Sequence, residues 1–166
     1  MRKILVTGGA GYIGSHTVVE LTAAGYTPII VDNLCNTSTQ NIEGIEKIIG
    51  NKIKWHNTDC TDKVGMDRVF TEEGTIEGAI HFAAYKAVEE SVADPIKYYE
   101  NNFGGTLNIL MAMHEANVKK IVFSSTAAVY SPSDKSAISE EDATVPLSPY
   151  GATKLLAEQL ITSVGK

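Results

Sequence analysis

Tyr150 and Lys154 are the residues of this sequence whose types and spacing most directly suggest chemistry. They lie four positions apart, just after Pro149, in a segment whose apolar residues have helical spacing, so they would share one face of a helix. A cationic lysine beside a phenol favours the phenolate, and such a pair can exchange a proton with an alcohol. Taken alone, the pair is more typical of a core tyrosine covered by a lysine stem. A catalytic role therefore needs a cofactor site and a further polar group.

The further polar group is a run of three hydroxyl residues, Ser124, Ser125 and Thr126. It ends the segment Lys119–Thr126, which predicts a strand that emerges into these hydroxyls. Hydroxyls at a strand end would lie beside the helix that carries the tyrosine. With a dinucleotide site in the same chain, we interpret Thr126, Tyr150 and Lys154 as candidate catalytic residues.

The dinucleotide site is indicated by the stretch from Thr7 to Gly14, which contains Gly8, Gly11 and Gly14. It separates the apolar run 3–6 from a segment, 15–21, with helical spacing, which predicts a strand, a glycine turn and a helix. Glycines permit a sharp turn and a close approach to a pyrophosphate, and the helix N-terminus then faces the phosphates. The alternative is a tight turn without a ligand. A nucleoside triphosphate loop would need Lys and then Ser or Thr after the last glycine, and this sequence has Ser15 and His16 there.

A second strand, 27–31, ends in Asp32, about 20 residues beyond the glycines. An acid at this position accepts hydrogen bonds from the adenosine ribose and repels a 2′-phosphate. No arginine follows in 33–35, so the sequence predicts NAD in preference to NADP. The polar loop from Asp32 to Thr39 is suited to lining an adenosine.

Five strands alternate with helices, which predicts an α/β fold with a doubly wound parallel sheet (a Rossmann fold) in the strand order 3-2-1-4-5. The other strands are expected at 52–56, 78–84 and 119–126, and a long helix from Pro95 to His114. Asp59 is expected to cap the helix that follows it. Asn101 and Asn102 lie inside the long helix, where a buried asparagine needs a polar role. The segment 131–136 predicts an exposed turn.

Length and composition restrict the remaining classes. The 166 residues fit one domain, 1–166, and the net charge of −6 without a basic run excludes an electrostatic nucleic-acid footprint. Only four residues, Ile4 to Thr7, separate Met1-Arg2-Lys3 from the glycines, so the apolar segment is too short for a signal peptide or a membrane span. We therefore expect neither export nor membrane insertion, and a cytoplasmic protein. Cys35 and Cys60 are expected to be reduced, and the four histidines have no ligand spacing, so we assign no metal.

Together these motifs resemble the extended short-chain dehydrogenase/reductase family, and within it the epimerases that act at C4 of UDP-sugars. The resemblance spans essentially the whole chain, in the family's order: 7–16, 31–34, 81–88, 98–102, 124–126 and 149–154. Two departures are Glu90 and Ser131, where members of this branch commonly have glycine. Members are also about twice as long, so the resemblance implies an N-terminal portion that lacks the last strands and the C-terminal substrate domain.

The resemblance implies a set of cofactor contacts. The residues implied at the pyrophosphate are Tyr12 and Ile13; at the adenosine, Asp32, Asn33, Cys35, Asn36, Asp59 and Cys60; and on the nicotinamide side, Phe82, Ala83, Ala84, Lys86 and Asn101, with Thr126, Tyr150 and Lys154 as the catalytic group.

The implied activity is NAD-dependent interconversion of UDP-glucose and UDP-galactose through a 4-keto sugar, in a homodimer, with this chain inactive alone. One alternative is a sugar-nucleotide 4,6-dehydratase, which needs acidic groups beside the hydroxyl strand end, where this sequence has Ala127 and Ala128. Another is a dinucleotide-binding module without catalysis, against which the retention of the catalytic group argues.

Overall fold

The computed structural model describes residues 2–130 and 137–165. It divides into two compact units. The sheet unit comprises the described residues of 1–83 and 108–124, and the helical unit those of 84–107 and 125–166. The turn expected at 131–136 lies outside the described residues.

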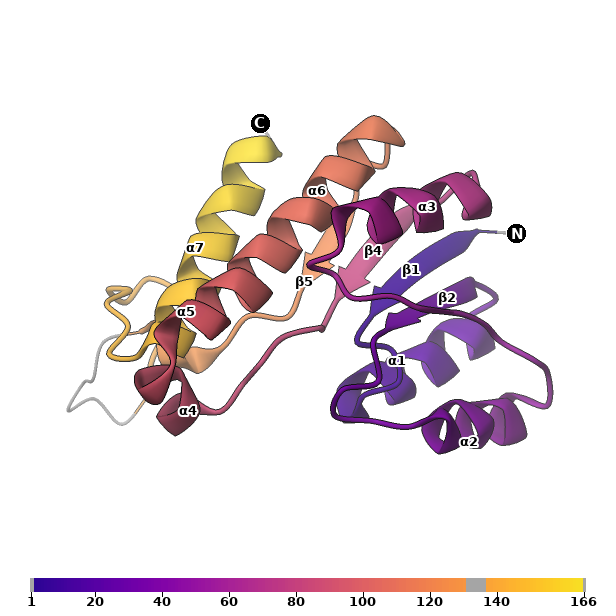
Figure 1. Ribbon diagram of the computed structural model, residues 1–166, viewed down its shortest axis with the longest axis horizontal. Coiled ribbons are helices and arrows are strands. Elements are labelled where there is room, and N and C mark those ends of the chain that lie inside the picture. The colour runs from indigo at the N-terminus through magenta and orange to yellow at the C-terminus, as the bar shows by residue number, and fades with distance from the viewer. Residues whose placement is uncertain (1, 131–136, 166) are drawn as a thin grey trace. The chain divides into compact units, whose positions relative to one another are not determined.

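The sheet unit is built on five parallel strands in the order β3-β2-β1-β4-β5 (Figure 1), which confirms the predicted topology. In β1, Leu5 pairs with Ile29 on one side and with Ala79 on the other. The strands are β1 (Lys3–Thr7), β2 (Thr27–Asp32), β3 (Lys54–Asn57), β4 (Gly78–His81) and β5 (Ile121–Phe123).

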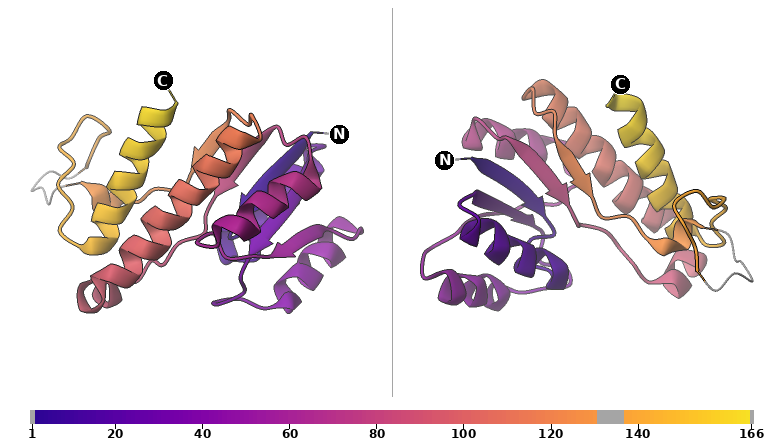
Figure 2. Two further views of the ribbon diagram at one scale, coloured as in Figure 1. Left: turned by 45° about the horizontal axis from the view of Figure 1, so that its top comes forward. Right: turned by 180° about the vertical axis from the view of Figure 1, so that it is seen from behind.

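Helices cover both faces of this sheet, which explains why β1 and β2 are continuous apolar runs. Helices α1 (Tyr12–Ala23) and α2 (Thr39–Ile49) cover one face, and α3 (Lys63–Glu73) with the sheet-unit part of α6 (Gly105–Glu115) covers the other (Figures 1 and 2). Under α1 and α2 a buried cluster forms the core, made of Val6, Val18, Ile30 and Ile45. The core thus holds β1 and β2 rigidly, and the glycine turn leaves from β1.

Sequence reasoning misplaced one helix cap. We expected Asp59 to cap α3, but Asp62 is the N-cap residue, and its carboxylate accepts a hydrogen bond from the Gly65 N–H at 3.0 Å. Asp59 lies three residues earlier and instead accepts bonds from the Thr61 N–H and hydroxyl. Both are aspartates of one polar loop, and which of them caps depends on where the first helical turn begins.

The helical unit contains α4 (Val88–Ala93), α5 (Pro95–Tyr98), the π-helix η1 (Tyr99–Gly104), the start of α6, the 3₁₀ turn η2 (Ala127–Val129) and α7 (Pro149–Val164). The helical run expected from Pro95 is present, but it is not one α-helix, because η1 interrupts it at Asn101 and Asn102. Neither η1 nor η2 was predicted from the sequence.

Candidate functional site

The glycine turn has the geometry that a phosphate site needs. Gly8 has a φ of +68°, and a Cβ there would lie 2.7 Å from the backbone nitrogen of Ala83, just beyond β4. A Cβ on Gly14 would overlap the carbonyl oxygen of Gly8. Gly11 is the N-cap residue of α1 and has no side chain with which to cap it. The first N–H groups of this helix are therefore left for a ligand, which fits a pyrophosphate.

Asp32 is a buried carboxylate at the end of β2 that joins the glycine turn to the loop behind it. Its Oδ2 accepts a bond from the Ala10 N–H at 3.0 Å. Its Oδ1 accepts from the Leu34 N–H at 2.9 Å and from the Thr37 hydroxyl at 3.3 Å. The side chain of Asn41 donates to the Ala10 carbonyl as well, so the turn is fixed from two sides. The acid expected at the ribose is held in place before any ligand binds.

The loop residues expected at the adenosine divide into two groups. Asn33 donates from its side chain to Asp59 at 2.6 Å and accepts from the Cys35 N–H, which links the loops after β2 and β3. Burial raises the pKa of Asp59, but the hydrogen bonds from Thr61 and Asn33 outweigh it and leave that pKa below its ordinary value. Cys35 and Asn36 are exposed. Asn33 and Asp59 thus form one polar platform.

The two cysteines are free, as expected, and differ in environment. Cys60 is buried, and burial raises the pKa of its thiol to about 12, with the charges of Asp59 and Asp32 adding to the effect. Its backbone carbonyl accepts a bond from the side chain of Asn108. The Cys60 thiol is therefore unreactive and does not act as a nucleophile.

The residues expected on the nicotinamide side fall into both units. In the sheet unit, the Phe82 N–H donates to the Thr7 carbonyl, which places Phe82 and Ala83 directly after β4 and beside the end of β1. Ala84, Lys86 and Asn101 belong to the helical unit.

Helix α7 carries the candidate catalytic pair. Ser148 is its N-cap residue and accepts a bond from the Gly151 N–H at 3.2 Å. Gly151 packs so closely against the turn η2 that a Cβ would overlap the Ala128 carbonyl oxygen. Tyr150 lies in the first turn, with its ring edge-on to that of Tyr98 at 6.5 Å between centroids. The start of α7 is thus fixed by a cap and by contact with η2.

Lys154 is not a lysine that extends to solvent over the tyrosine. The residue is only 4% exposed. Burial lowers the pKa of its ammonium group from 10.5 to about 8, and the negative charge of Glu158 acts in the opposite direction. A buried lysine with a lowered pKa is typical of a functional site rather than of a helix surface.

Thr126 lies at the N-cap position of η2, where its hydroxyl oxygen accepts a bond from the Ala128 N–H at 3.2 Å. The hydroxyl keeps its own proton to donate to another group. Its neighbour Ser125 donates a hydrogen bond to the carboxylate of Glu158 on α7. Two of the three expected hydroxyl residues are therefore tied into local structure around α7 and η2.

Sequence reasoning selected Asn101 and passed over Asn102, which is the better connected of the two. The buried Asn102 amide accepts from the Tyr85 N–H and donates to the Tyr85 carbonyl at 2.8 and 3.0 Å. It also donates to the hydroxyl of Thr153, which in turn donates to the Tyr150 carbonyl. The signal was the pair of asparagines in a helix, and burial determines which one fills the polar role.

No three potential metal ligands among His, Cys, Asp and Glu come together within residues 2–130 and 137–165. None of the helices in the same ranges is both long and apolar enough to span a bilayer.

A glycine turn that opens a helix, an acid at the end of the second strand and a Tyr/Lys pair on a later helix define a dinucleotide-dependent dehydrogenase-like protein. The family model of the NAD dependent epimerase/dehydratase family matches residues 4–166. The chain belongs to this family.

Among curated relatives, the UDP-glucose 4-epimerase of Dictyostelium discoideum is 50% identical over 159 residues, and that of Bacillus subtilis is 49% identical over 158. These matches cover 96% and 95% of this chain but 46% of each relative. The chain therefore spans about half the length of the curated relatives it matches.

Solved structures give the same result. The UDP-glucose 4-epimerase of Stenotrophomonas maltophilia, with bound NAD and formylated UDP-arabinopyranose, superposes with a TM-score of 0.94 at 41% identity. The enzyme of Bifidobacterium longum, in complex with NAD+ and UDP, gives 0.93 at 47% identity. They cover 99% and 98% of this chain, and 48% of each of those chains.

Proposed function

We propose that this chain supplies the NAD-binding half and the proton-transfer residues of a UDP-glucose 4-epimerase, which interconverts UDP-glucose and UDP-galactose at C4. The observation that carries the proposal is the buried Lys154 one helical turn beyond Tyr150. It is supported by relatives with that name and by related structures that hold NAD.

NAD fits the residues of the sheet unit. The N-terminus of α1, behind Gly8, Gly11 and Gly14, would hold the pyrophosphate, with Tyr12 and Ile13 beside it. Asp32 would accept bonds from the ribose, and the platform of Asn33 and Asp59, with Cys35, Asn36 and Cys60, would hold the adenosine. The nicotinamide half is assigned to Phe82, Ala83, Ala84, Lys86 and Asn101, together with Tyr150 and Lys154.

In the reaction, the Tyr150 phenolate takes the proton from the C4 hydroxyl of the sugar and later returns it. Lys154, as the ammonium ion, stabilises the phenolate, and the Thr126 hydroxyl donates a hydrogen bond to the same sugar oxygen. Bound NAD would supply the reversible acceptance of a hydride at C4, on which inversion of that centre depends.

Two other functions are less well supported. A 4,6-dehydratase must remove a C5 proton and protonate a leaving hydroxyl, and the residues that follow Thr126 in η2 are alanines. A non-catalytic NAD-binding module has no use for a buried ammonium group at Lys154, whose burial destabilises the charged form.

The test is a chimera in which residues 1–166 replace the matching half of the Bacillus subtilis relative. We expect the chimera to convert UDP-galactose to UDP-glucose, and its Tyr150→Phe variant to lose at least ~10²-fold in kcat while still binding NAD. A chimera that binds NAD but has no turnover would support the binding-module alternative. Wild-type kcat in the Tyr150→Phe variant would refute the role of Tyr150.

The chain alone is proposed to bind NAD but to be inactive, because the related structures that hold a UDP-sugar or UDP are about twice its length. The proposal includes a homodimer. It is supported by exposed apolar side chains on two long helices, Leu107 and Met111 on α6 and Leu156 and Val164 on α7. Light scattering on the chain would test it, and a clean monomer would contradict it.

A further inference from the structure

Glu158 is a third ionisable residue on the face of α7 that carries Tyr150 and Lys154. The three residues are spaced four apart, so their side chains follow one another along one side of the helix. Glu158 is partly buried, and it lies one turn beyond a lysine that is almost completely buried. This order places a carboxylate, an ammonium group and a phenol in a row.

The position of the Glu158 carboxylate is fixed from outside the helix. Its Oε1 accepts a hydrogen bond from the hydroxyl of Ser125, which directly precedes Thr126. A glutamate on a helix surface samples several rotamers and loses entropy when it is held in one. The bond to Ser125 holds this carboxylate on the side of α7 that carries Lys154, and it also connects the segment around Thr126 to α7.

A buried ammonium group needs a counter-charge to remain protonated. Burial lowers the pKa of Lys154, and the charge of Glu158 is the influence that raises it. The proposed reaction needs the charged form, because a neutral amine would not stabilise a phenolate. Loss of the Glu158 charge would therefore lower the pKa of Lys154 further and reduce the cationic fraction at neutral pH.

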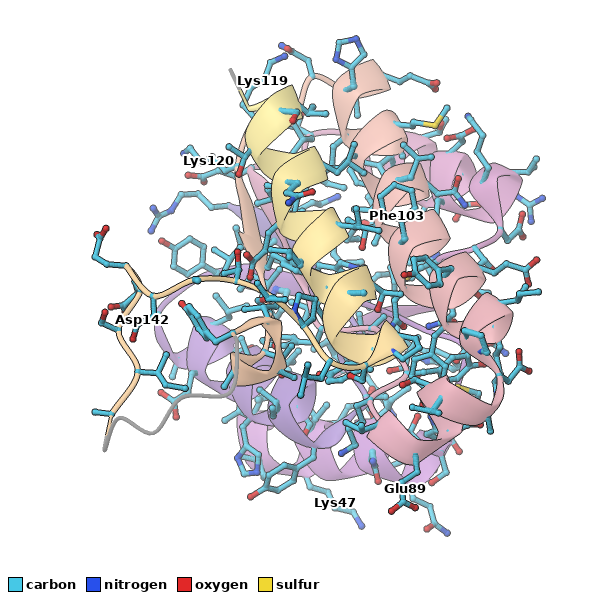
Figure 3. The ribbon with its side chains drawn as sticks, turned by 90° about the vertical axis from the view of Figure 1, so that its left-hand side faces the viewer. Lys47, Glu89, Phe103, Lys119, Lys120 and Asp142 are labelled. Atoms are coloured by element: carbon cyan, nitrogen blue, oxygen red, sulfur yellow. The ribbon has the colours of Figure 1, made fainter. Side chains whose placement is uncertain are left out.

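The other ionisable groups on the elements packed against α7 are engaged elsewhere or exposed. On α4, Glu90 pairs with Lys97 at 2.6 Å and accepts a bond from the Tyr98 hydroxyl at 2.7 Å. Glu89 extends away from the ribbon (Figure 3). On η1, Tyr99 and Glu100 are exposed. Tyr98 is buried and its hydroxyl donates to Glu90, so only its uncharged ring faces Tyr150.

We propose that Glu158 is a positioning residue that keeps Lys154 in its ammonium form, so that the lysine can support the Tyr150 phenolate. The inference rests on the proposed function, which gives Lys154 its role, but its test measures the pKa of Lys154 and not turnover. The carboxylate acts through Lys154 and contacts neither cofactor nor substrate in this role.

The test is an NMR titration of the lysine side-chain signals in the 166-residue chain and in its Glu158→Gln variant. The Lys154 signal is assigned from its disappearance in Lys154→Arg. We expect the pKa of Lys154 to fall by about one unit or more in Glu158→Gln, because the neutral amide keeps the shape and the bond to Ser125 but not the charge. Glu158→Asp should restore most of the difference.

The matched control is Glu100→Gln, which removes an exposed carboxylate from the same unit and should leave the pKa of Lys154 unchanged. An unchanged pKa in Glu158→Gln, with the spectrum otherwise preserved, would overturn the proposal. So would an equal fall in both variants, since it would mean that net charge and not position is responsible. Loss of turnover in Tyr150→Phe is a separate measurement, so failure of either proposal can be recognised.

Discussion

Replacing Lys154 with methionine should stabilise the chain, and the gain should depend on pH. The folded state lowers the pKa of this lysine, whereas the unfolded chain keeps the ordinary value of 10.5. Below about pH 8 both states carry the charge, and only the folded state has it buried. As the pH rises from about 8 to 10.5, the folded chain releases its proton first, so its stability increases with pH. Above pH 10.5 the lysine is neutral in both states, and the free-energy cost of burying its charge has disappeared.

The size of the effect follows from the same shift. A pKa lowered from 10.5 to about 8 corresponds to about 3 kcal/mol of lost stability at neutral pH. Methionine removes the charge and keeps an apolar stem of similar length, but Glu158 then loses its counter-charge. We therefore expect Lys154→Met to raise the free energy of unfolding by about 1–3 kcal/mol near pH 7.

Urea unfolding followed by circular dichroism, near neutral pH and above pH 10.5, measures this difference. The control is Lys119→Met at an exposed lysine (Figure 3), where we expect no pH-dependent difference from the parent. The stabilisation of Lys154→Met should shrink as the pH rises. A difference that is the same at both pH values, or a net loss of stability near neutral pH, would refute the account of Lys154 as a buried charge.

Three further outcomes are expected. In parallel fluorescence titrations, NAD should bind the chain at least about tenfold more tightly than NADP, since Asp32 repels a 2′-phosphate; equal affinities would contradict this. Gly14→Ala should weaken NAD binding and lower the free energy of unfolding by about 1–3 kcal/mol, because the added Cβ would overlap the Gly8 carbonyl oxygen. Gly44→Ala is the control and should not destabilise the chain, because the space around Gly44 is open. Burial raises the pKa of the Glu73 carboxyl, but side-chain bonds to His56 and Lys3 leave that pKa below its ordinary value of 4.5. Glu73→Gln should therefore cost about 1–3 kcal/mol at neutral pH, and urea unfolding should show that this cost shrinks below pH 4.5.

The parts of the site that sequence reasoning predicted well are those that local chemistry determines. The turn at Gly8 needs a positive φ, and the start of α1 needs small residues, so the glycines themselves indicate a close backbone approach. Asp32 was found because the second strand is an unbroken apolar run that ends in an acid. Strand order followed from the number and spacing of such runs.

The parts that were missed depend on packing between distant segments. Glu158 was not selected from the sequence, because nothing local shows that Ser125 lies opposite it. The burial of Lys154 also comes from its surroundings and not from its neighbours in the sequence. Asp59 and Asp62 are equally good caps by composition, and their roles separate only once the helix start is known.

The π-helix η1 shows why helical spacing can predict a helical run correctly and still give no sign of an irregular turn within it. We expected an uninterrupted helix from Pro95 to His114, and the buried residues Tyr98, Asn102 and Thr106 do keep intervals of four through η1. A single wider turn hardly changes that spacing, but it shifts the residues before it relative to those after it. The shift lies where the Asn101 side chain donates to that of Asn102, which in turn holds the backbone of Tyr85. An irregular turn of this kind is common at functional sites, and here it adjoins both the expected cofactor residue Asn101 and the chain of bonds that ends at the backbone of Tyr150.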